Sequence, residues 1–434
     1  MFDYREVLCR QTGLIPSIQM ANCLSPFHDG THLALCHTGQ INEIYPHLGL
    51  KFQSDKEARV IGSGCALQPE FAQLKAVFEA LERYSAVVYS ERDLTLATAE
   101  DLGADSIDWT LFENLYVRSP LTGETTPNPF DPRKPIRWIT AYHAVKKRAI
   151  YVPMIMTHIH SMPRDGEEFY PQTTTGIAAH VSPEAAIVSA LCEVIERDAV
   201  ETVWRTRAPL QQIDIDVSLP PGCNELHDRD CASRAFVDQR YYDATLELGI
   251  PTIYSVRKLM PPVGNDVIVS CASHPNALEA LYKARLEASS QQIMRQNESA
   301  GACYSRYKSE SGFLVKDCLQ FRPDLSFLGP TSEREKPLSA LCEFNLRSNS
   351  WDAASVLSIV SERHKEIAII DISTDEMLNL GVHVFKAVIP TLMPSAPSEF
   401  QSFARHRRML DVASFFGLRD WTLSNFNSDP QPFC

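Results

Sequence analysis

The chain has 434 residues, 44% hydrophobic and 22% charged, which is enough for two or three structural units around a packed core. Its formal net charge of -13 argues against nucleic acid as a partner, because phosphate binding draws on clustered lysine and arginine. The N-terminal stretch has no apolar segment, and no apolar run approaches the roughly 18 residues of a membrane span. We therefore expect a cytoplasmic protein without membrane association.

Three segments share an internal similarity that repeats glutamates. The first, Gln68–Ala86, has Pro69 where a first helical turn accepts proline, and its body is rich in Ala, Leu, Glu and Lys. Positions i, i+3 and i+4 lie on one face of a helix, so Glu79, Glu82 and Arg83 are expected to cluster. The segment predicts a largely buried helix, because its neighbouring residues are apolar.

Between the first and second similar segments, the residues from Pro127 to Pro135 are predicted to form a surface loop, and the β-branched run from Tyr151 to His158 a buried strand. The second segment, Ser182–Val200, aligns with the first without a gap. Glu193, Glu196 and Arg197 then fall on the glutamates and arginine of the first segment. This helix is also expected to be largely buried.

The third similar segment, His274–Ile293, keeps one glutamate of the pattern, Glu287. It has Gln291 where the others have arginine and Ser290 where they have a second glutamate. On its N-terminal side we expect a surface loop from Leu219 to Asp230. On its C-terminal side we expect a looser connection from Lys308 to Glu335.

Two further β-branched runs, Ile367–Ile372 and Val382–Ile389, are typical of buried strands. Together with the helices they predict one α/β (α+β) domain with mixed sheets. The last residues, Asp429–Cys434, are proline-rich, and by themselves they would be read as a frayed terminus.

The repetition of acidic helices favours a cation site. One Glu-x-x-Glu-Arg cluster is usually a solvated face with an ion pair worth a few tenths of a kcal/mol. Carboxylates on buried helices instead resist desolvation unless a cation neutralises them, and several converging carboxylates offer the hard oxygen ligands that magnesium takes. Magnesium at such sites commonly carries phosphates, which arginine binds in bidentate fashion. We therefore predict one pocket for a metal-bound nucleotide.

Other chemistries lack their motifs. The 12 cysteines form no C-x-x-C pair, so most are expected to be small buried hydrophobes, with a metal role as the minor alternative. No G-x-x-x-x-G-K-[ST] loop, H-E-x-x-H or G-x-S-x-G occurs, and the glycines at Gly62 and Gly64 lack the third glycine of a dinucleotide fingerprint. The histidines near the repeats receive no catalytic role.

These segments resemble the ATP-binding motifs of the YcaO family. GSGCALQPEFAQLKAVFEALERYSA is similar to its first motif, YPQTTTGIAAHVSPEAAIVSALCEVIERDAVETVWRTR to its second, and ASHPNALEALYKARLEASSQQI to its third. DISTDEMLNLGVHVFKAVIPTLMP resembles a late family segment. The resemblance implies a YcaO domain over residues 61–434, preceded by a segment over residues 1–60 for which contact with a partner is one expected role.

The resemblance also implies the site. Glutamates hold Mg²⁺ around ATP in that family, which carries over to Glu79, Glu82, Glu193, Glu196 and Glu287. The matching polar positions, expected to bind the nucleotide, are Lys75, Arg83, Thr175, Arg197, Lys283 and Gln291. The ring-forming branch ends in a proline-rich tail that reaches the active site, which assigns catalytic roles to Pro432 and Cys434.

Three positions depart from the family pattern: Lys75 stands where serine is common, Thr175 where asparagine is common, and Cys434 where proline is expected. Lys75 is expected to serve as a phosphate ligand, with filling of the pocket as its alternative. The departures also leave open a catalytically silent scaffold that binds a peptide or partner, although all five glutamates are retained.

The implied activity is that of an ATP-dependent cyclodehydratase. It phosphorylates a backbone amide oxygen of a ribosomal precursor peptide and converts Cys, Ser or Thr into thiazolines or (methyl)oxazolines. The same chemistry with another nucleophile would give a thioamide or an amidine. The expected partners are the precursor peptide and a ThiF-like leader-binding protein, with a flavin-dependent azoline dehydrogenase as a further candidate, in a homodimer or hetero-oligomer. The substrate supplies its own nucleophile, so no triad is needed.

Overall fold

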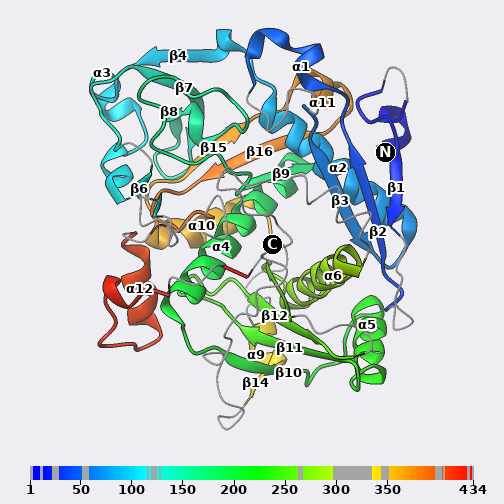
Figure 1. The fold of residues 1–434 in the computed structure, drawn as a ribbon. Helices are drawn as coiled ribbons and strands as arrows, with labels where there is room; N and C mark the ends of the chain where they lie inside the picture. The colour runs from blue at the N-terminus through cyan, green and yellow to red at the C-terminus, as the bar shows by residue number, and fades with distance from the viewer. Residues whose placement is uncertain are drawn as a thin grey trace.

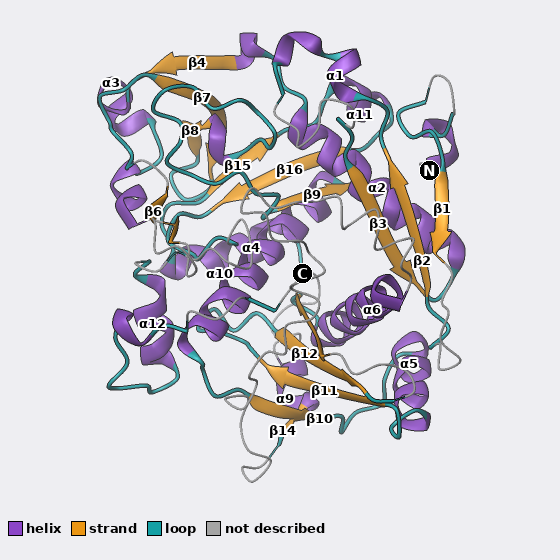
Figure 2. Cartoon of the chain, viewed as in Figure 1, coloured by secondary structure: helices purple, strands orange, loops and turns teal. Residues whose placement is uncertain are grey.

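The computed structural model describes residues 3–9, 13–21, 29–50, 58–114, 117–118, 125–126, 129–261, 267–296, 335–343, 351–395, 403, 406–427 and 431–432. Three larger antiparallel or mixed sheets and the helices between them form the mixed α/β architecture expected from the sequence (Figures 1 and 2). None of the helices in these residues is long and apolar enough to traverse a lipid bilayer.

The first sheet lies near the N-terminus and is antiparallel, in the order β1-β2-β3. Its strands are β1 (Ile18–Ala21), β2 (His32–His37) and β3 (Ile61–Ala66). The short helix α1 (Ile41–Ile44) follows β2, and the long helix α2 (Pro69–Val87) packs on β2 and β3. Strand β2 belongs to the expected N-terminal segment, residues 1–60, and strand β3 belongs to the expected domain, residues 61–434. Because β2 pairs with β3, the first sheet contains strands from both parts of the chain.

The second sheet has the order β4-β7-β15-β16-β9, with β8 on the other side of β7. Its strands are β4 (Leu94–Ala97), β7 (Ile136–His143), β8 (Arg148–Pro153), β9 (Ile177–His180), β15 (Ala368–Asp371) and β16 (His383–Val388). The helices around it are α3 (Ala99–Leu102), α4 (Pro183–Thr206), α10 (Ala353–Arg363), α11 (Asp375–Asn379) and α12 (Arg408–Phe415). Helix α4 packs on β9 and β16, and α10 and α12 pack on α4.

The third sheet has the order β13-β12-β11-β10-β14, and only its β10–β14 pair is parallel. Its strands are β10 (Gln211–Asp214), β11 (Val237–Asp243), β12 (Thr252–Leu259), β13 (Val267–Ser273) and β14 (Lys336–Pro337). The associated helices are α5 (Pro221–Ala232), α6 (Ala277–Gln296) and α9 (Leu338–Cys342), and α6 packs on β12 and β13. A two-residue pair, β5 (Val117–Arg118) and β6 (Thr125–Thr126), completes the strands.

The three glutamate segments are helices, as predicted, and each packs against a different sheet. Pro69 and Pro183 occupy the first turns of α2 and α4, where the missing N–H removes no helical hydrogen bond. Each helix also follows directly after a strand, so the chain repeats a strand–helix unit three times. In Figure 1, α4 lies between the second sheet and the third, and α6 lies between the third sheet and the strands β2 and β3 of the first.

Two predicted segments differ in the structure. Leu219–Asp230, expected as a loop, contains most of α5, because Pro221 opens the helix and Cys223, Leu226 and Asp230 turn inward. The strand expected over Tyr151–His158 ends at Pro153, where β8 passes into a 3-10 turn at Met154–Met156. The strands expected at Ile367–Ile372 and Val382–Ile389 are β15 and β16.

The predicted loop from Pro127 to Pro135 is confirmed over residues 129–135, while residues 127 and 128 lie outside the described residues. The looser connection predicted from Lys308 to Glu335 also lies outside them, except for Glu335 itself. Of the eight free cysteines in the described part of the chain, five are buried. The burial of these five agrees with their interpretation as small hydrophobes.

Candidate functional site

Helix α2 holds its first glutamate against the preceding strand. The Glu79 carboxylate accepts hydrogen bonds from the backbone N–H of Ser63 and from the Ser63 hydroxyl, the latter at 2.7 Å. Arg83, one turn further along α2, pairs with Glu79 at 2.6 Å and donates to the carbonyl of Ile61 at 2.6 Å. Both side chains remain about a quarter exposed. The pair therefore faces an accessible space beside β3.

Helix α4 repeats this arrangement with its own strands. The backbone N–H of Gly176, just before β9, donates to Glu193 at 3.1 Å, and that of Ser273, at the end of β13, donates to Glu196 at 3.3 Å. Arg197 lies 3.8 Å from Glu193 and 3.6 Å from Glu196. Burial would lower the pKa of Arg197, but the surrounding glutamates outweigh it and raise the pKa. The arginine is therefore firmly cationic.

Helix α6 contributes a glutamate, an amide and a lysine. Glu287 is half-buried, and Lys283, one turn earlier, is exposed. The Gln291 side chain is 4% exposed, and neither its amide nitrogen nor its amide oxygen has a hydrogen-bond partner among the described residues. Orphaned buried amides cost free energy. Gln291 thus presents a donor and an acceptor suited to a polar ligand.

The glutamates of the three helices influence one another electrostatically. Burial raises the pKa of Glu196 to about 7 and that of Glu287 to about 8. The charge of Glu193 adds to the shift of Glu196, and the charge of Glu196 adds to that of Glu287. Burial followed by the charges of Glu193 and Glu79 also raises the pKa of Glu82 well above its usual range. Like charges this close are tolerated only if protons or a cation neutralise them. The structure therefore brings all five predicted glutamates into one acidic cluster.

The cluster is open. Within the described residues, no three His, Cys, Asp or Glu side chains enclose one point closely enough to hold a metal ion unaided. Magnesium commonly takes one or two protein carboxylates and completes its shell with water and substrate phosphates. The geometry therefore suits a metal that arrives with a phosphate-bearing ligand better than a preformed structural site.

Lys386 of β16 is a site residue that the sequence did not single out. It is 3% exposed, and its ammonium donates to the carbonyl of Thr173 at 3.0 Å. Burial lowers its pKa to about 8, against the opposing influence of Glu193 and Glu82. The available signal was a single lysine inside the apolar run VHVFKAVI. It places a fixed cation beside the acidic cluster.

The glycines before α2 have a packing role. A Cβ atom at Gly62 would collide with the carbonyl of Ala76, and one at Gly64 with the carbonyl of Ala72. Strand β3 and helix α2 thus approach closely enough for the strand backbone to reach Glu79. The motif Gly62-Ser63-Gly64 is explained by this contact.

Two further predicted nucleotide contacts are Lys75 on α2 and Thr175 before β9. Lys75 donates to the carbonyl of Cys65 at 3.1 Å, and desolvation and the charge of Lys283 lower its pKa. Thr175 is buried and lines a small cavity together with Lys386. Of the tail, Pro432 is half-buried, and Cys434 lies outside the described residues.

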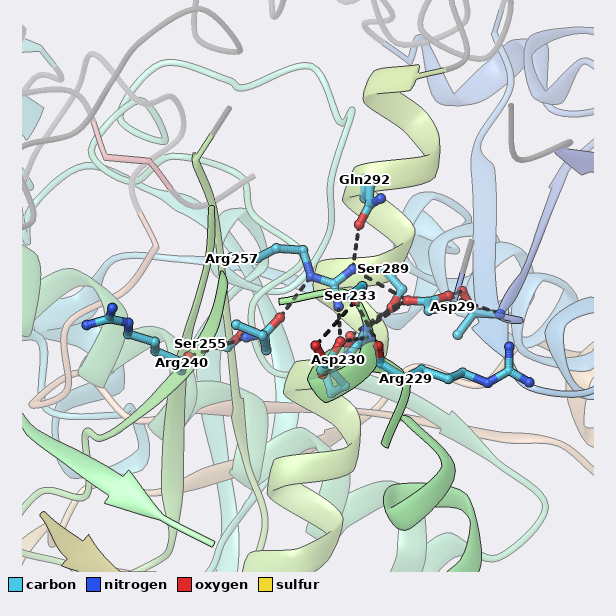
Figure 3. A network of polar contacts seen from close by, with 12 residues as sticks. Asp29, Arg229, Asp230, Ser233, Arg240, Ser255, Arg257, Ser289 and Gln292 are labelled. Atoms are coloured by element: carbon cyan, nitrogen blue, oxygen red, sulfur yellow. Dashed lines mark hydrogen bonds and ion pairs between the residues drawn. The ribbon is translucent and has the colours of Figure 1, made fainter. Parts of the chain in front are cut away.

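A buried ionic network fixes the opposite face of α6 (Figure 3). Arg285 donates to Asp230 of α5 at 2.6 and 2.5 Å and to Asp29 at 2.9 Å. Ser289 donates to Asp29 at 2.7 Å, and Arg257 of β12 pairs with both aspartates at 3.4 and 3.5 Å. Because Arg285 and Ser289 each lie two positions from Glu287, and Ser289 lies two from Gln291, these contacts set how α6 presents its functional face.

A family model described as the YcaO cyclodehydratase, ATP- and Mg²⁺-binding, matches residues 63–393. The chain belongs to the YcaO family. This YcaO protein is 26% identical over 242 residues to an uncharacterized protein in the tfuA 3' region of Rhizobium leguminosarum bv. trifolii, a match that covers 53% of this chain and 54% of that protein.

Solved structures agree with the fold of this YcaO protein. A heterocyclase in complex with substrate and cofactor aligns with 99% of this chain and 56% of its own, at 19% identity and a TM-score of 0.77. YcaO from Methanopyrus kandleri, bound with AMPPCP and Mg²⁺, aligns with 87% of this chain and 86% of its own, at 16% identity and a TM-score of 0.57. The chain thus matches about half the length of the curated relative and of the first heterocyclase.

Proposed function

We propose that this YcaO protein is an ATP-dependent cyclodehydratase that converts Cys, Ser or Thr residues of a ribosomal precursor peptide into thiazolines or (methyl)oxazolines. The observation that supports this proposal is the meeting of carboxylates from three helices in one cluster, beside two arginines and the unpartnered amide of Gln291. A metal-bound triphosphate matches these groups in charge and in hydrogen-bonding capacity.

The acidic cluster fits magnesium. Because burial raises the pKa of Glu82, Glu196 and Glu287, a cation that favours their ionised form gains from binding there. The residues that would hold Mg²⁺ are Glu79, Glu82, Glu193, Glu196 and Glu287. The residues that would contact the nucleotide are Lys75, Arg83, Thr175, Arg197, Lys283 and Gln291.

ATP with Mg²⁺ would supply a phosphoryl group that turns the amide oxygen of the substrate into a leaving group. The chain contributes position and charge. Arg83, paired with Glu79, and Arg197, near Glu193 and Glu196, would neutralise developing negative charge on that group. A Cys, Ser or Thr of the peptide attacks its own preceding carbonyl, so the site needs no protein nucleophile.

Replacement of single glutamates tests this assignment. Glu79→Gln and Glu193→Gln remove charge with little change in shape, so folding should persist while turnover falls by on the order of a hundredfold or more. The measurement is ADP release that depends on a precursor peptide, together with loss of one water mass per ring. Glu184→Gln, exposed on α4, is the matched control and should retain activity. Full activity of both cluster variants would refute the site assignment.

The same assay separates the other activities. Replacement of an amide oxygen by sulfur, seen as the net gain in mass of an oxygen-to-sulfur exchange, would identify a thioamide-forming relative. Condensation of the activated amide with an amine nitrogen, with the Cys, Ser and Thr side chains unmodified, would identify an amidine-forming one. Binding of peptide without ADP release would identify the silent scaffold. A ThiF-like protein and a flavin-dependent dehydrogenase are proposed partners, and adding the first should increase ring formation by delivering the peptide.

The C-terminal segment is proposed to approach the site through its anchorage on α4. The backbone N–H of Asn427 donates to the carbonyl of Arg205 at 2.7 Å, and its side chain contacts the carbonyl of Trp204 and the guanidinium of Arg207, both at 3.3 Å. Gln431 further along is 5% exposed. These contacts hold Asn427 at the C-terminal end of α4, and the proposed roles of Pro432 and Cys434 rely on this anchor.

Asn427→Ala should release this anchor. Loss of its two side-chain hydrogen bonds should cost about 1–3 kcal/mol of local stability, and turnover should fall while nucleotide binding persists. Calorimetry with Mg-ATP and the ring-formation assay measure the two effects separately. Ser424→Ala, exposed in the preceding turn, is the control. Unchanged turnover in Asn427→Ala would show that the tail has no role in the reaction.

A further inference from the structure

A second cavity of about 860 Å³ lies at the C-terminal end of α2. Its walls come from the residues that follow α2, from the turn after α1, and from the segment between β15 and α11. None of the five clustered glutamates and none of the proposed nucleotide contacts lines it. Glu82 and Val88, which lines the cavity, are six residues apart, or about 9 Å along a helix axis. The cavity is therefore separate from the acidic cluster but close to it.

The cavity wall carries an excess of negative charge. Its carboxylates are Glu91, Asp93, Asp371, Asp375 and Glu376, and its arginine is Arg92. Glu91 is already paired, with Arg137 at 3.1 Å and Arg164 at 2.8 Å. The other four carboxylates face the single charge of Arg92.

Glu376 is kept ionised. Burial alone would raise its pKa, but polar groups around the carboxylate, including the hydroxyl of Tyr45, outweigh this effect and lower the pKa. The Tyr45 hydroxyl donates to Glu376 at 2.9 Å and is itself 2.8 Å from the Tyr84 hydroxyl of α2. Since Tyr45 uses its proton on Glu376, Tyr84 must be the donor between the two tyrosines. This pair of bonds ties the cavity wall to the glutamate helix.

His158 adds a buried acceptor at the wall. Its side chain is 3% exposed, and burial lowers its pKa to about 3, so the ring is neutral. The Thr157 hydroxyl donates to the carbonyl of Met154 at 2.9 Å, so its oxygen can only accept from Nδ1 of His158 at 2.8 Å. The proton therefore sits on Nδ1. Nε2 keeps a bare lone pair, with no hydrogen-bond partner among the described residues.

These groups need the same kind of ligand. Carboxylates and an unprotonated imidazole nitrogen are all acceptors, so they are matched by a cationic group with several N–H donors, such as an ammonium or guanidinium. A cavity of this volume lies in the range of ligand sites and has room for a few extended residues. A free metal ion would use far less of the space.

We propose that this cavity binds a basic stretch of the polypeptide substrate, whose lysine or arginine side chains donate to Asp93, Asp375 and His158. The identity of the ligand as substrate rests on the proposed function, whereas the preference for a basic peptide rests on the cavity alone. Binding here would hold the peptide about two helical turns of α2 away from the acidic cluster.

Binding of a model peptide tests the cavity without any turnover. The probe is a fluorescein-labelled hexapeptide of alternating glycine and arginine, compared by anisotropy with the same peptide carrying neutral citrulline. The arginine peptide should bind more tightly, and its affinity should fall as salt is raised. Asp93→Asn combined with Asp375→Asn should weaken binding about tenfold, since two exposed charge pairs are lost together.

The matched control replaces two exposed aspartates elsewhere, Asp411→Asn with Asp420→Asn, which keeps the same net charge. Equal affinity in the two double variants, or equal binding of the arginine and citrulline peptides, would overturn the proposal. In an active preparation, the arginine peptide should raise the KM for the precursor without changing kcat, and an unchanged KM would refute substrate binding in this cavity. If no precursor is turned over, the anisotropy result still decides whether the cavity takes basic peptides.

Discussion

Glu196 and Glu287 hold protons at pH values where an exposed glutamate has lost them. Their pKa values, about 7 and about 8, exceed the ordinary value because burial disfavours the charged form. The folded protein therefore binds protons more tightly than the unfolded chain. Without a cation, stability should be greatest below about pH 4.5 as far as these groups are concerned and should fall as pH rises to about 8.

Thermal unfolding at several pH values measures this dependence. The melting temperature of the protein without nucleotide should decrease between about pH 6 and about pH 8, and Mg-ATP should restore it most strongly at the higher pH. Glu287→Gln, neutral at every pH, should flatten the decrease. A melting temperature that rises over this interval and is unaffected by Glu287→Gln would contradict the burial of charge in the cluster.

The sequence identified the glutamates because their spacing recurs, and recurrence is visible without a structure. Lys386 belongs to no such repeat. In the alternating pattern of a strand, a lysine is ordinarily interpreted as a residue that faces solvent. The orphaned amide of Gln291 was also hidden, because the absence of a partner depends on residues far away in the chain. Local pattern reveals which side chains are present, whereas their partners are set by tertiary packing.

The strand–helix unit depends on close contact between the strand and the helix. At Gly64, a Cβ atom would meet the carbonyl of Ala72 and the backbone N–H of Ala76 on α2, and neither backbone group can move aside alone. Gly64→Ala should therefore lower the free energy of unfolding by about 1–3 kcal/mol. It should also reduce ATP-dependent turnover, because a displaced α2 carries Glu79 away from Ser63.

Urea denaturation and the ring-formation assay test this change together. Gly39→Ala is the control, because nothing lies within 4 Å of a Cβ atom built there. Equal stability of the Gly64 and Gly39 variants would show that β3 and α2 can separate without cost. In that case the contact would not be what places the first glutamate.

Helices and strands could be predicted from the sequence where the periodicity of apolar residues was strong. The predictions were wrong where local signals conflicted. The long helices and the strands β15 and β16 follow from their patterns of apolar residues. Helix α5 was missed because its sequence PGCNELHDRDCA is polar and opens with proline and glycine, which favour loops when read locally. Its few inward residues, including Leu226 and Asp230, are stabilised by contacts with the third sheet and α6 that the local sequence does not reveal.

The three sheets and their helices form one site only if α6 keeps its orientation, and this depends on a network that spans the molecule. Asp29 lies before β2, Asp230 lies on α5, and both bind Arg285 of α6 and Arg257 of β12 (Figure 3). Burial would raise the pKa of Asp29, but the two arginines and hydrogen bonds hold it well below its usual range. The network therefore joins the first sheet to the third through full charges.

Asp230→Asn should lower the free energy of unfolding, because it removes one carboxylate from this buried ionic network. Removing the Asp230 carboxylate leaves Arg285 and Arg257 with Asp29 as their single counter-charge in the network. The side chains of these arginines are only 3% and 1% exposed, and breaking a buried ion pair in this way costs about 3–5 kcal/mol. Denaturant unfolding should show this loss, whereas Asp228→Asn, exposed on the same helix, should change stability by less than about 0.5 kcal/mol. Because the network positions α6, Asp230→Asn should also weaken Mg-ATP binding at temperatures where the protein remains folded. If stability falls while nucleotide affinity is unchanged, the network stabilises the fold without setting the orientation of Glu287 and Gln291.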